Sequence, residues 1–379
     1  MIISKSIFTG VTALVPLLSP GYKTIMHIAV GLSGGVDSAV TAWLLKKAGH
    51  DVVGTIMRIW DGRSASHTKG NACYGPNEDE DVDDAQSVCT TLGIPLHVID
   101  CSKQYNELVL KYFDDEYRSG RTPNPCIVCN QGIKFGMLPA LLAESGVAFD
   151  KFATGHYVRV EHDEASQRFV LKKGVDPKKD QSYFLYRLTQ KQLSKILCPL
   201  GVYTKEQVRV MAHEAQLPVH DKKESQDFYS GDYTELLSVK QVPGDLVTIE
   251  GKVLGKHNGY CNYTIGQRKG LGVAGGKPLY VIAIDACNNK VIVGDKDQLW
   301  SNGLVADNVH LGTIALPHHL TAKTRSASPA VSCTADYDGT MLTVMFDEPQ
   351  SAITPGQSVV LYDGDAVVGG GIIKNKINN

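Results

Sequence analysis

Residue types suited to binding phosphate gather in one short segment near the N-terminus, residues 33–38, which reads Ser-Gly-Gly-Val-Asp-Ser. It follows an apolar stretch and precedes a helical pattern, so backbone N–H groups and the positive end of a helix would surround an anion. Gly34 and Gly35 let the backbone approach the oxygens. Ser33 and Ser38 can donate hydroxyl hydrogen bonds. Asp37 can hold a Mg²⁺ ion that arrives with ATP.

This loop lacks the lysine that a Walker loop places at the terminal phosphates of ATP. It therefore suits the release of pyrophosphate better than the transfer of the terminal phosphoryl group. An ordinary glycine-rich turn is the alternative. Six residues in this order resemble the loop of the ATP pyrophosphatase family, in which AMP is joined to a substrate oxygen. NAD synthetase, argininosuccinate synthetase and tRNA lysidine synthetase share that loop, so it predicts the activation step and leaves the substrate open.

Two thiols three residues apart, Cys126 and Cys129, follow a segment stiffened by Pro123 and Pro125. They precede a helix that we expect to open near Ile133. Near a helix start, the helix dipole lowers the pKa of a thiol and makes it more nucleophilic. The same spacing also suits half of a zinc site or a redox pair. The residues alone leave these uses open.

Five segments together carry a more specific resemblance: residues 33–38, 121–135, 154–157, 179–185 and 263–271. With them the chain resembles the bacterial tRNA-specific 2-thiouridylase family from about Met26 to its C-terminus. The resemblance implies ATP-dependent thiolation of the wobble uridine of certain tRNAs. The C2 oxygen is adenylated, and sulfur then replaces it with loss of AMP.

The resemblance also implies roles for single residues. Cys129 matches the catalytic thiol of the motif Cys-Asn-x-x-Ile-Lys-Phe. The positions that match ATP contacts are Gly31, Leu32, Ser33, Gly34, Gly35, Val36, Asp37, Ser38, Met57 and Gly155. The positions that match the surroundings of the target base or tRNA are Asn124, Pro125, Cys126, His156, Lys179, Asp180, Gln181 and Gln357. A core position for Met57 and a structural role for His156 are the alternatives.

The chain departs from the family pattern at the second cysteine. Many members carry a cysteine shortly after a Glu-Ser-Gln segment, where it receives sulfur as a persulfide, but residues 224–230 contain none. At a position before the catalytic thiol that is often Asp, this chain has Cys126. Cys126 and Cys129 then act as a nucleophile and resolving pair, or they join Cys73 as ligands of a [4Fe-4S] cluster with one open iron.

The partners implied are tRNA and a sulfur donor, for which a persulfide carrier protein, a cysteine desulfurase and sulfide all stay open. The missing cysteine motivates an alternative function, a tRNA- and ATP-binding protein that has lost sulfur transfer. A second enzyme class, adenylation for amidation, is opposed by a thiol within the motif beside the base site.

Alternating strands and helices must position the loop and the thiols. Apolar patterns predict strands over residues 27–32, 52–59, 95–101 and 149–154. Helical patterns follow the loop up to Gly49 and recur over residues 81–92, 105–117 and 133–143. Such alternation predicts a parallel sheet with the ligand site at the carboxyl ends of its strands.

The helical periodicity fades from about residue 231. Residues 279–286 and 290–294 flank an Asn-Asn turn and predict a hairpin, and later turns at Asp-Gly pairs predict a small closed or sandwiched β domain. We therefore expect an α/β fold with four parts. They are an extension (1–25), an ATP-pyrophosphatase domain (26–230), a middle domain (231–300) and a C-terminal β-barrel-like domain (301–379). The extension is unstructured, a targeting segment or an early start.

The composition limits the compartment and the partners. Nine cysteines in 379 residues form an odd and scattered set, which predicts a reducing compartment and hence the cytoplasm. No uninterrupted apolar run approaches 18 residues, so we expect no membrane partner. A net charge of -2 neither favours nor opposes RNA, since binding depends on local basic clusters. Lys172, Lys173, Lys178 and Lys179 form the largest such cluster.

Overall fold

The computed structural model describes residues 24–62, 72–223, 228–273, 277–312, 316 and 319–378. The chain divides into two compact units. The first comprises Met1–Asn106 and Cys129–Ser230, and the second comprises Glu107–Val128 and Gly231–Asn379. The expected extension up to residue 25 and the segment 224–227 lie almost wholly outside the described residues.

A five-stranded parallel sheet in the order β3-β2-β1-β4-β7 forms the centre of the first unit. Its strands are β1 (His27–Gly31), β2 (Asp51–Arg58), β3 (Leu96–Asp100), β4 (Lys151–Thr154) and β7 (Ile196–Leu197). The chain leaves β1 toward β2 on one side and returns to β4 on the other, so the strand order reverses beside β1. Ligands of such sheets bind outside the carboxyl ends of the strands at this reversal. The predicted parallel sheet is confirmed.

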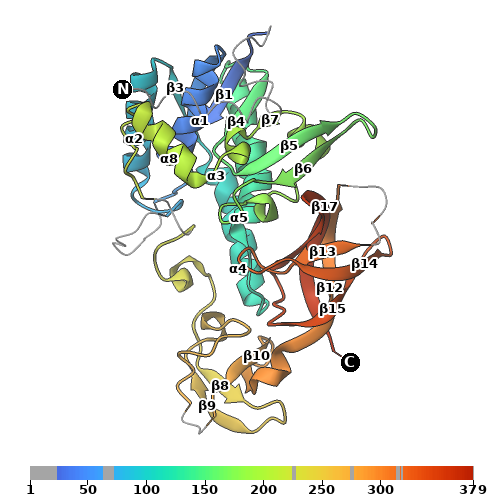
Figure 1. Cartoon of the computed structure of the whole chain (residues 1–379). Coiled ribbons are helices and arrows are strands. Elements are labelled where there is room, and N and C mark those ends of the chain that lie inside the picture. The colour runs from blue at the N-terminus through green and yellow to red at the C-terminus, as the bar shows by residue number, and fades with distance from the viewer. Residues whose placement is uncertain are drawn as a thin grey trace, which may run out of the picture. The chain divides into compact units, whose positions relative to one another are not determined.

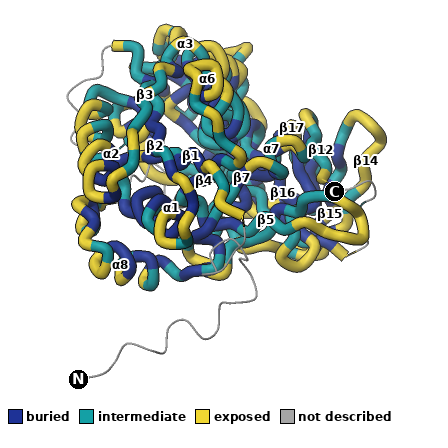
Figure 2. The backbone as a smooth tube through the Cα atoms, turned by 90° about the horizontal axis from the view of Figure 1, so that it is seen from above, coloured by how far each residue is buried: buried dark blue, intermediate teal, exposed yellow. Residues whose placement is uncertain are grey.

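Helices cover both faces of this sheet. On one side lie α1 (Val36–Lys47), α2 (Glu78–Leu92) and α8 (Lys205–Glu214), and on the other α3 (Ser102–Tyr105) and α6 (Leu138–Glu144) (Figure 2). The buried residues of β1, β2 and the helices α1, α2 and α8 form one continuous hydrophobic core. Because the central strands are buried on both faces, they appear in the sequence as short apolar runs without alternation. The smaller elements are η4 (Ser182–Phe184), α7 (Gln190–Leu193) and η5 (Pro199–Val202).

Several features of the first unit differ from the expectation, among them the two-residue strand β7, which was not predicted. The helix predicted to open near Ile133 begins earlier, with α5 (Pro125–Val128) continuing through the π-helical η3 (Cys129–Met137) into α6. Proline is favoured at the first position of a helix, so Pro125 marks its start. The hairpin of β5 (Val158–Asp163) and β6 (Arg168–Lys173) was not predicted, because charged residues occupy many of its positions. Helix α8 was not predicted either.

The helical segment Pro125–Glu144 has the length and composition of a membrane span, with a mean hydropathy of 1.4 in its most apolar window. Asn130, Gln131 and Lys134 interrupt it, so it is not an uninterrupted apolar run of the kind that the sequence analysis excluded. Within the first unit, however, the amides of Asn130 and Gln131 donate hydrogen bonds to the carbonyls of Phe184 and Arg187, at 3.3 and 3.0 Å. These contacts are those of a helix packed inside a domain. The absence of a membrane partner stays a prediction.

The second unit contains a helical segment, a small sheet and a barrel (Figure 1). The helical segment consists of η2 (Asn106–Leu110) and α4 (Lys111–Arg118), which precede α5. The sheet has the order β10-β11-β8-β9, with β8 (Gly244–Val247), β9 (Val253–His257), β10 (Tyr280–Asp285) and β11 (Lys290–Gly294). Strands β10 and β11 pair antiparallel around the Asn-Asn turn, which confirms the predicted hairpin. Short 3₁₀ turns are η6 (Tyr233–Leu236), η7 (Tyr260–Asn262) and η8 (Lys296–Leu299).

Six antiparallel strands close into a barrel at the end of the chain. They are β12 (Trp300–Leu311), β13 (Leu320–Lys323), β14 (Val331–Tyr337), β15 (Leu342–Ser351), β16 (Ser358–Asp363) and β17 (Ala366–Ile377). Strand β12 pairs with both β15 and β17, which closes the ring. Alternate residues of β15, Leu342, Val344 and Phe346, face the barrel core. The predicted closed β domain is confirmed.

Candidate functional site

The loop after β1 is folded around the side chain of Ser38. The Ser38 hydroxyl accepts a hydrogen bond from the Ser33 amide at 3.1 Å and donates one to the Gly35 carbonyl at 3.2 Å. Gly34 has a backbone φ of +66°, a conformation that residues other than glycine rarely adopt. No side chain caps α1 at Gly35. The first N–H groups of α1 therefore lack the usual capping acceptor, which suits them to an anion.

The carboxylate of Asp37 is held by two residues that the sequence analysis missed. Lys205, on α8, donates to both of its oxygens at 2.7 and 2.8 Å, and the Tyr157 hydroxyl donates to one of them at 2.8 Å. Lys205 is only 8% exposed, so this ion pair is largely screened from water. Thr204 and Gln207 form a capping box at the start of α8, a sequence signal that would have revealed the helix and its first lysine.

The end of β4 packs directly against the phosphate loop. A Cβ atom added to Gly155 would lie 2.8 Å from both the Asp37 carbonyl carbon and the Ser38 nitrogen. Only glycine permits so close an approach. The structure thus brings together the predicted loop residues and Gly155. Met57, near the carboxyl end of β2, is half-buried and so does not belong to the fully buried core.

The surroundings of Asp37 limit its predicted role as a magnesium ligand. Mg²⁺ prefers oxygen ligands and usually keeps several waters and phosphate oxygens in its coordination shell. Asp37 supplies carboxylate oxygens, but the Lys205 ammonium group already neutralises them. A cation on the same carboxylate would lie beside a positive charge. The site therefore fits Mg²⁺ poorly through Asp37 alone, and we assign no step to an ion held by this residue.

In the second unit, the segment that precedes the thiols is fixed by polar contacts. The side-chain amide of Gln357, the residue directly before β16, donates hydrogen bonds to the carbonyls of Thr122 and Pro123 at 3.0 and 3.1 Å. The Arg121 guanidinium donates to both oxygens of buried Glu116, and these bonds raise the pKa of Arg121. The predicted residue Gln357 is therefore brought to the segment that carries Asn124, Pro125 and Cys126.

The two thiols lie three positions apart in one helical segment. Cys126 occupies the first turn of α5 and is half-buried, and Cys129 begins η3 and is buried. Residues three apart share a helix face. Pro125 precedes both at the helix start, where partial positive charge accumulates.

Cys73, the third proposed cluster ligand, is exposed in the first unit. Next to it, Tyr74 is buried, donates its backbone N–H to the Phe228 carbonyl at 2.8 Å and stacks on Tyr105. Cys73 and Cys129 belong to the first unit and Cys126 to the second, and their joint binding of a [4Fe-4S] cluster stays a prediction.

The predicted tRNA contacts of the first unit have internal partners. The Nδ1 atom of His156 lies 2.8 Å from the Thr154 hydroxyl. Desolvation by burial, reinforced by nearby Lys134, lowers the pKa of His156 to about 3. The imidazole is therefore neutral near pH 7 and offers stacking or hydrogen bonds instead of charge.

Asp180 and Gln181 shape the loop before η4. The Asp180 carboxylate accepts hydrogen bonds from the backbone of Gly174 and from the backbone and hydroxyl of Ser182. The Gln181 side-chain carbonyl accepts from the Tyr157 amide at 2.9 Å. These bonds link the loop to Tyr157, which in turn contacts Asp37. Asp180 and Gln181 thus have a structural use that the sequence did not reveal.

Three family models match consecutive parts of the chain. The descriptions are a tRNA methyl transferase HUP domain over residues 26–229, a tRNA methyl transferase PRC-barrel domain over 235–295 and an aminomethyltransferase beta-barrel domain over 301–373. The first alone covers more than half of the chain. The three models together account for the parallel-sheet unit, the small sheet and the closed barrel.

Named relatives match nearly the whole chain. The protein "tRNA-specific 2-thiouridylase MnmA" of Endomicrobium trichonymphae is 50% identical over 359 residues, which are 93% of this chain and 99% of that protein. The protein of the same name from Clostridioides difficile is 43% identical, over 92% of this chain and 98% of that protein. A solved structure of the U34-tRNA thiolase NcsA from Methanococcus maripaludis is 21% identical. It covers 56% of this chain and 64% of that one at a TM-score of 0.33, too low to bear on the site.

Proposed function

The chain belongs to the tRNA-specific 2-thiouridylase family, and we propose that it uses ATP to replace the C2 oxygen of the wobble uridine of tRNA with sulfur. The identity of 50% over 99% of a relative's length carries this conclusion. The loop geometry supports it, because the switch point of the parallel sheet carries an uncapped helix start suited to phosphate. None of the relatives favours a binding protein without sulfur transfer.

In the activation step, the loop holds the phosphates of ATP. The N–H groups at the start of α1 and the hydroxyl of Ser33 face the anion, while Gly34 and Gly155 leave room for the backbone to approach it. Lys205 and Tyr157 keep the Asp37 carboxylate fixed beneath the loop. The C2 oxygen of uridine attacks the first phosphorus, pyrophosphate leaves, and the uridine carries AMP on that oxygen. Magnesium, if it accompanies ATP, would be held chiefly by phosphate oxygens.

In the sulfur step, Cys129 delivers the nucleophile. A persulfide on Cys129 attacks the activated C2 carbon with its terminal sulfur, and AMP leaves with the former C2 oxygen. The Cys126 thiolate then attacks Cys129 Sγ, which leaves sulfur on the base and a Cys126–Cys129 disulfide that a thiol reductant must reopen. Placement three residues apart on one helical segment supports this exchange. A persulfide carrier protein or a cysteine desulfurase loads Cys129 by transferring its outer sulfur to the Cys129 thiolate. Sulfide loads it by attacking Cys129 Sγ of the Cys126–Cys129 disulfide, which leaves a persulfide on Cys129 and releases the Cys126 thiolate.

A [4Fe-4S] cluster bound by Cys73, Cys126 and Cys129 is the second route for sulfur. Such a cluster would supply an open iron that binds sulfide and presents it to the base. Iron content and visible absorption of anaerobically purified protein separate the two routes. Protein that is iron-free, colourless and fully active would remove the cluster from the proposal, whereas activity that needs iron and Cys73 would remove the disulfide exchange.

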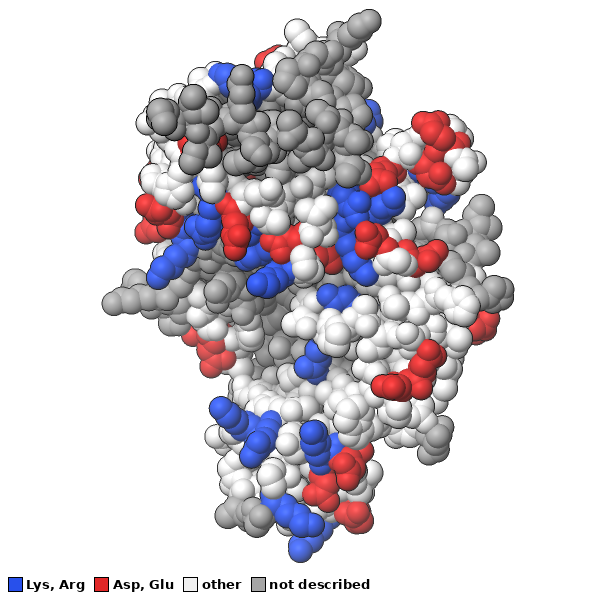
Figure 3. Space-filling model, viewed as in Figure 1, with Lys and Arg blue, Asp and Glu red and all other residues white. Residues whose placement is uncertain are grey.

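Contacts with tRNA are proposed for both units. In the second, Asn124, Pro125 and Cys126 would lie beside the base, with Gln357 holding their segment. In the first, Lys179 would contact phosphate, and neutral His156 would contact a base, while Asp180 and Gln181 would keep their loop in shape. On the face in Figure 3, basic side chains lie among acidic ones. Recognition would therefore depend on the fit of a folded RNA more than on one basic surface.

The cytoplasm is the proposed location. The proposal rests on the odd and scattered set of nine cysteines, which is unlike a disulfide framework.

Purified protein, ATP, sulfide and unmodified tRNA test the proposed function directly. Wild-type protein should form 2-thiouridine, detected by mass spectrometry of tRNA nucleosides, and release AMP. Cys129→Ala should lose thiolation while it still binds tRNA, and Cys287→Ala, which removes an exposed thiol elsewhere, should match the wild type. Undiminished thiolation by Cys129→Ala would contradict the role of that thiol. Wild-type protein that binds tRNA and never releases AMP would contradict the function.

A further inference from the structure

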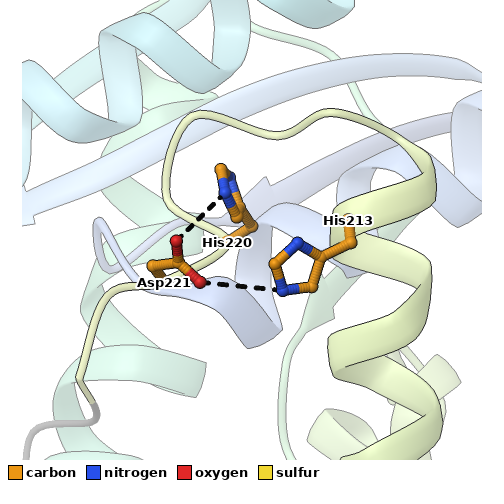
Figure 4. A group of neighbouring side chains, drawn as sticks. All are labelled: His213, His220 and Asp221. Atoms are coloured by element: carbon orange, nitrogen blue, oxygen red, sulfur yellow. Dashed lines mark ion pairs between the residues drawn. The ribbon is translucent and has the colours of Figure 1, made fainter.

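Two histidines and an aspartate meet on the surface of the first unit. His213 comes from the last turn of α8, and His220 and Asp221 come from the turns that follow (Figure 4). The Nε2 atoms of His213 and His220 lie 3.6 and 3.2 Å from the two oxygens of Asp221. The three donor atoms all lie within 4.8 Å of one another. Neither the nucleotide nor the sulfur chemistry uses this group.

The protonation of His220 is set by a backbone contact. Its Nδ1 atom lies 2.6 Å from the carbonyl oxygen of Leu217. A carbonyl can only accept, so Nδ1 carries the hydrogen and Nε2 of the neutral ring presents a lone pair. That lone pair faces a carboxylate oxygen of Asp221, which is also an acceptor. Two acceptors at this distance require a cation between them, either a second proton on the ring or a metal ion.

We propose that His213, His220 and Asp221 bind a divalent transition-metal ion of the zinc type, with water in the fourth position. Two imidazoles and one carboxylate form a ligand set that such ions favour over Mg²⁺ or Ca²⁺. Ligands about 2.0–2.1 Å from a tetrahedral ion lie roughly 3.3 Å apart, close to the two measured contacts. The bond from His220 Nδ1 to a backbone carbonyl is the outer contact that metal-binding histidines usually make.

The position of the site indicates what a bound ion would do. Lys222, the residue after Asp221, donates hydrogen bonds to the carboxylates of Asp81 and Asp84 on α2. Asp81 in turn packs on Gly34, since a Cβ atom added to Gly34 would lie 2.8 Å from the Asp81 carbonyl oxygen. A bound ion would join α8 to the turn that ends at Asp221. It would thereby fix the position of Lys222, whose hydrogen bonds hold α2 against the phosphate loop. The ion is therefore structural and lies outside the reaction itself.

Binding of Co²⁺ to the full chain tests this site. The nine thiols of the chain can also bind the ion, but thiolate ligands give Co²⁺ an intense near-ultraviolet charge-transfer absorption that nitrogen and oxygen ligands lack. The wild type should bind one Co²⁺ per chain with visible absorption and no thiolate band. His213→Ala and His220→Ala should each weaken that binding about 10-fold or more. The ion should also raise the thermal midpoint of the wild type.

His162→Ala is the matched control, because His162 also lies beside a carboxylate, that of Glu164, and belongs to no three-donor group among the residues that the structure describes. It should bind Co²⁺ as the wild type does. Asp221→Asn keeps the size of the side chain and should weaken binding even if an alanine variant unfolds, which circular dichroism would reveal. Equal binding by the wild type and by folded His213, His220 and Asp221 variants would overturn the proposal and leave a protonated ion pair.

Discussion

The phosphate loop and the cysteine segment are held by different kinds of contact. Close backbone packing at Gly155 and a largely buried ion pair between Asp37 and Lys205 fix the loop. By contrast, the segment before the thiols is fixed by hydrogen bonds from Gln357, 235 positions away from Thr122 in sequence. Nucleotide activation thus depends on a rigid cradle within the first unit, whereas the sulfur segment depends on the barrel of the second unit.

Lys205→Met should produce the largest loss of stability, because it leaves the Asp37 carboxylate without its counter-ion. We expect about 2–3 kcal/mol, between the values for exposed and buried ion pairs. Trp43 and Trp60 lie in the first unit and Trp300 in the second. In a Trp300→Phe background, urea unfolding followed by fluorescence would therefore report on the first unit alone.

The matched control for this change is Arg58→Ala, which removes an exposed pair with Asp79 in the same unit. It should change the free energy of unfolding by less than about 1 kcal/mol. Adding Asp37→Asn to Lys205→Met should recover part of the loss, because the unpaired charge is removed. Equal effects of the Lys205 and Arg58 changes would show that the ion pair does not hold the loop.

Gly155→Ala should weaken ATP binding with a smaller loss of stability. The new methyl group would push β4 away from the backbone of Asp37 and Ser38, at a cost of about 1–3 kcal/mol. We expect the KM for ATP in AMP formation to rise roughly 10-fold, as about 1.4 kcal/mol implies. Gly255→Ala is the control, since its added Cβ would meet nothing closer than 3.7 Å. An unchanged KM in Gly155→Ala would contradict the close-packed cradle.

Gln357→Ala should slow thiolation by loosening the segment before Cys126 and Cys129, and it should leave ATP binding at the phosphate loop unchanged. It removes two hydrogen bonds to carbonyls and should cost about 1 kcal/mol, or roughly 5- to 10-fold in the rate of thiolation. The affinity for ATP should stay the same. Gln350→Ala, at a half-buried position in β15 whose side-chain amide donates to the nearby Glu348 carbonyl, should leave both quantities unchanged. A Gln357 variant that weakens ATP binding and spares thiolation would reverse the contrast between the two regions.

The smallest effect concerns the pH dependence of stability. The pKa of His156 is lowered to about 3 in the folded state, so the unfolded chain binds one more proton between about pH 6.5 and 3. Stability therefore falls as the pH drops through that window and is unaffected by His156 above it. His156→Gln should reduce the slope of unfolding free energy against pH by up to one proton. An identical slope would show that His156 is protonated in the folded protein.

The sequence predicted those parts of the molecule that local patterns determine. The loop between β1 and α1, four of the five parallel strands and the hairpin around Asn288 and Asn289 depend on neighbouring residues and turn chemistry, and these were found. The two-residue strand β7 was missed. Lys205 was missed because its partner lies 168 positions away, and Gln357 was assigned by resemblance alone. The late start predicted for the helix at Pro125 came from reading the apolar pattern without the preference of proline for a first turn.

Isotope transfer from the base tests the central claim, adenylation of the C2 oxygen, most directly. The substrate would be tRNA with ¹⁸O at C2 of the wobble uridine, incubated with the purified protein, ATP and sulfide. The account predicts one ¹⁸O atom in each AMP released, in step with the 2-thiouridine formed. Label found in orthophosphate together with ADP, or in water with unlabelled AMP, would contradict it.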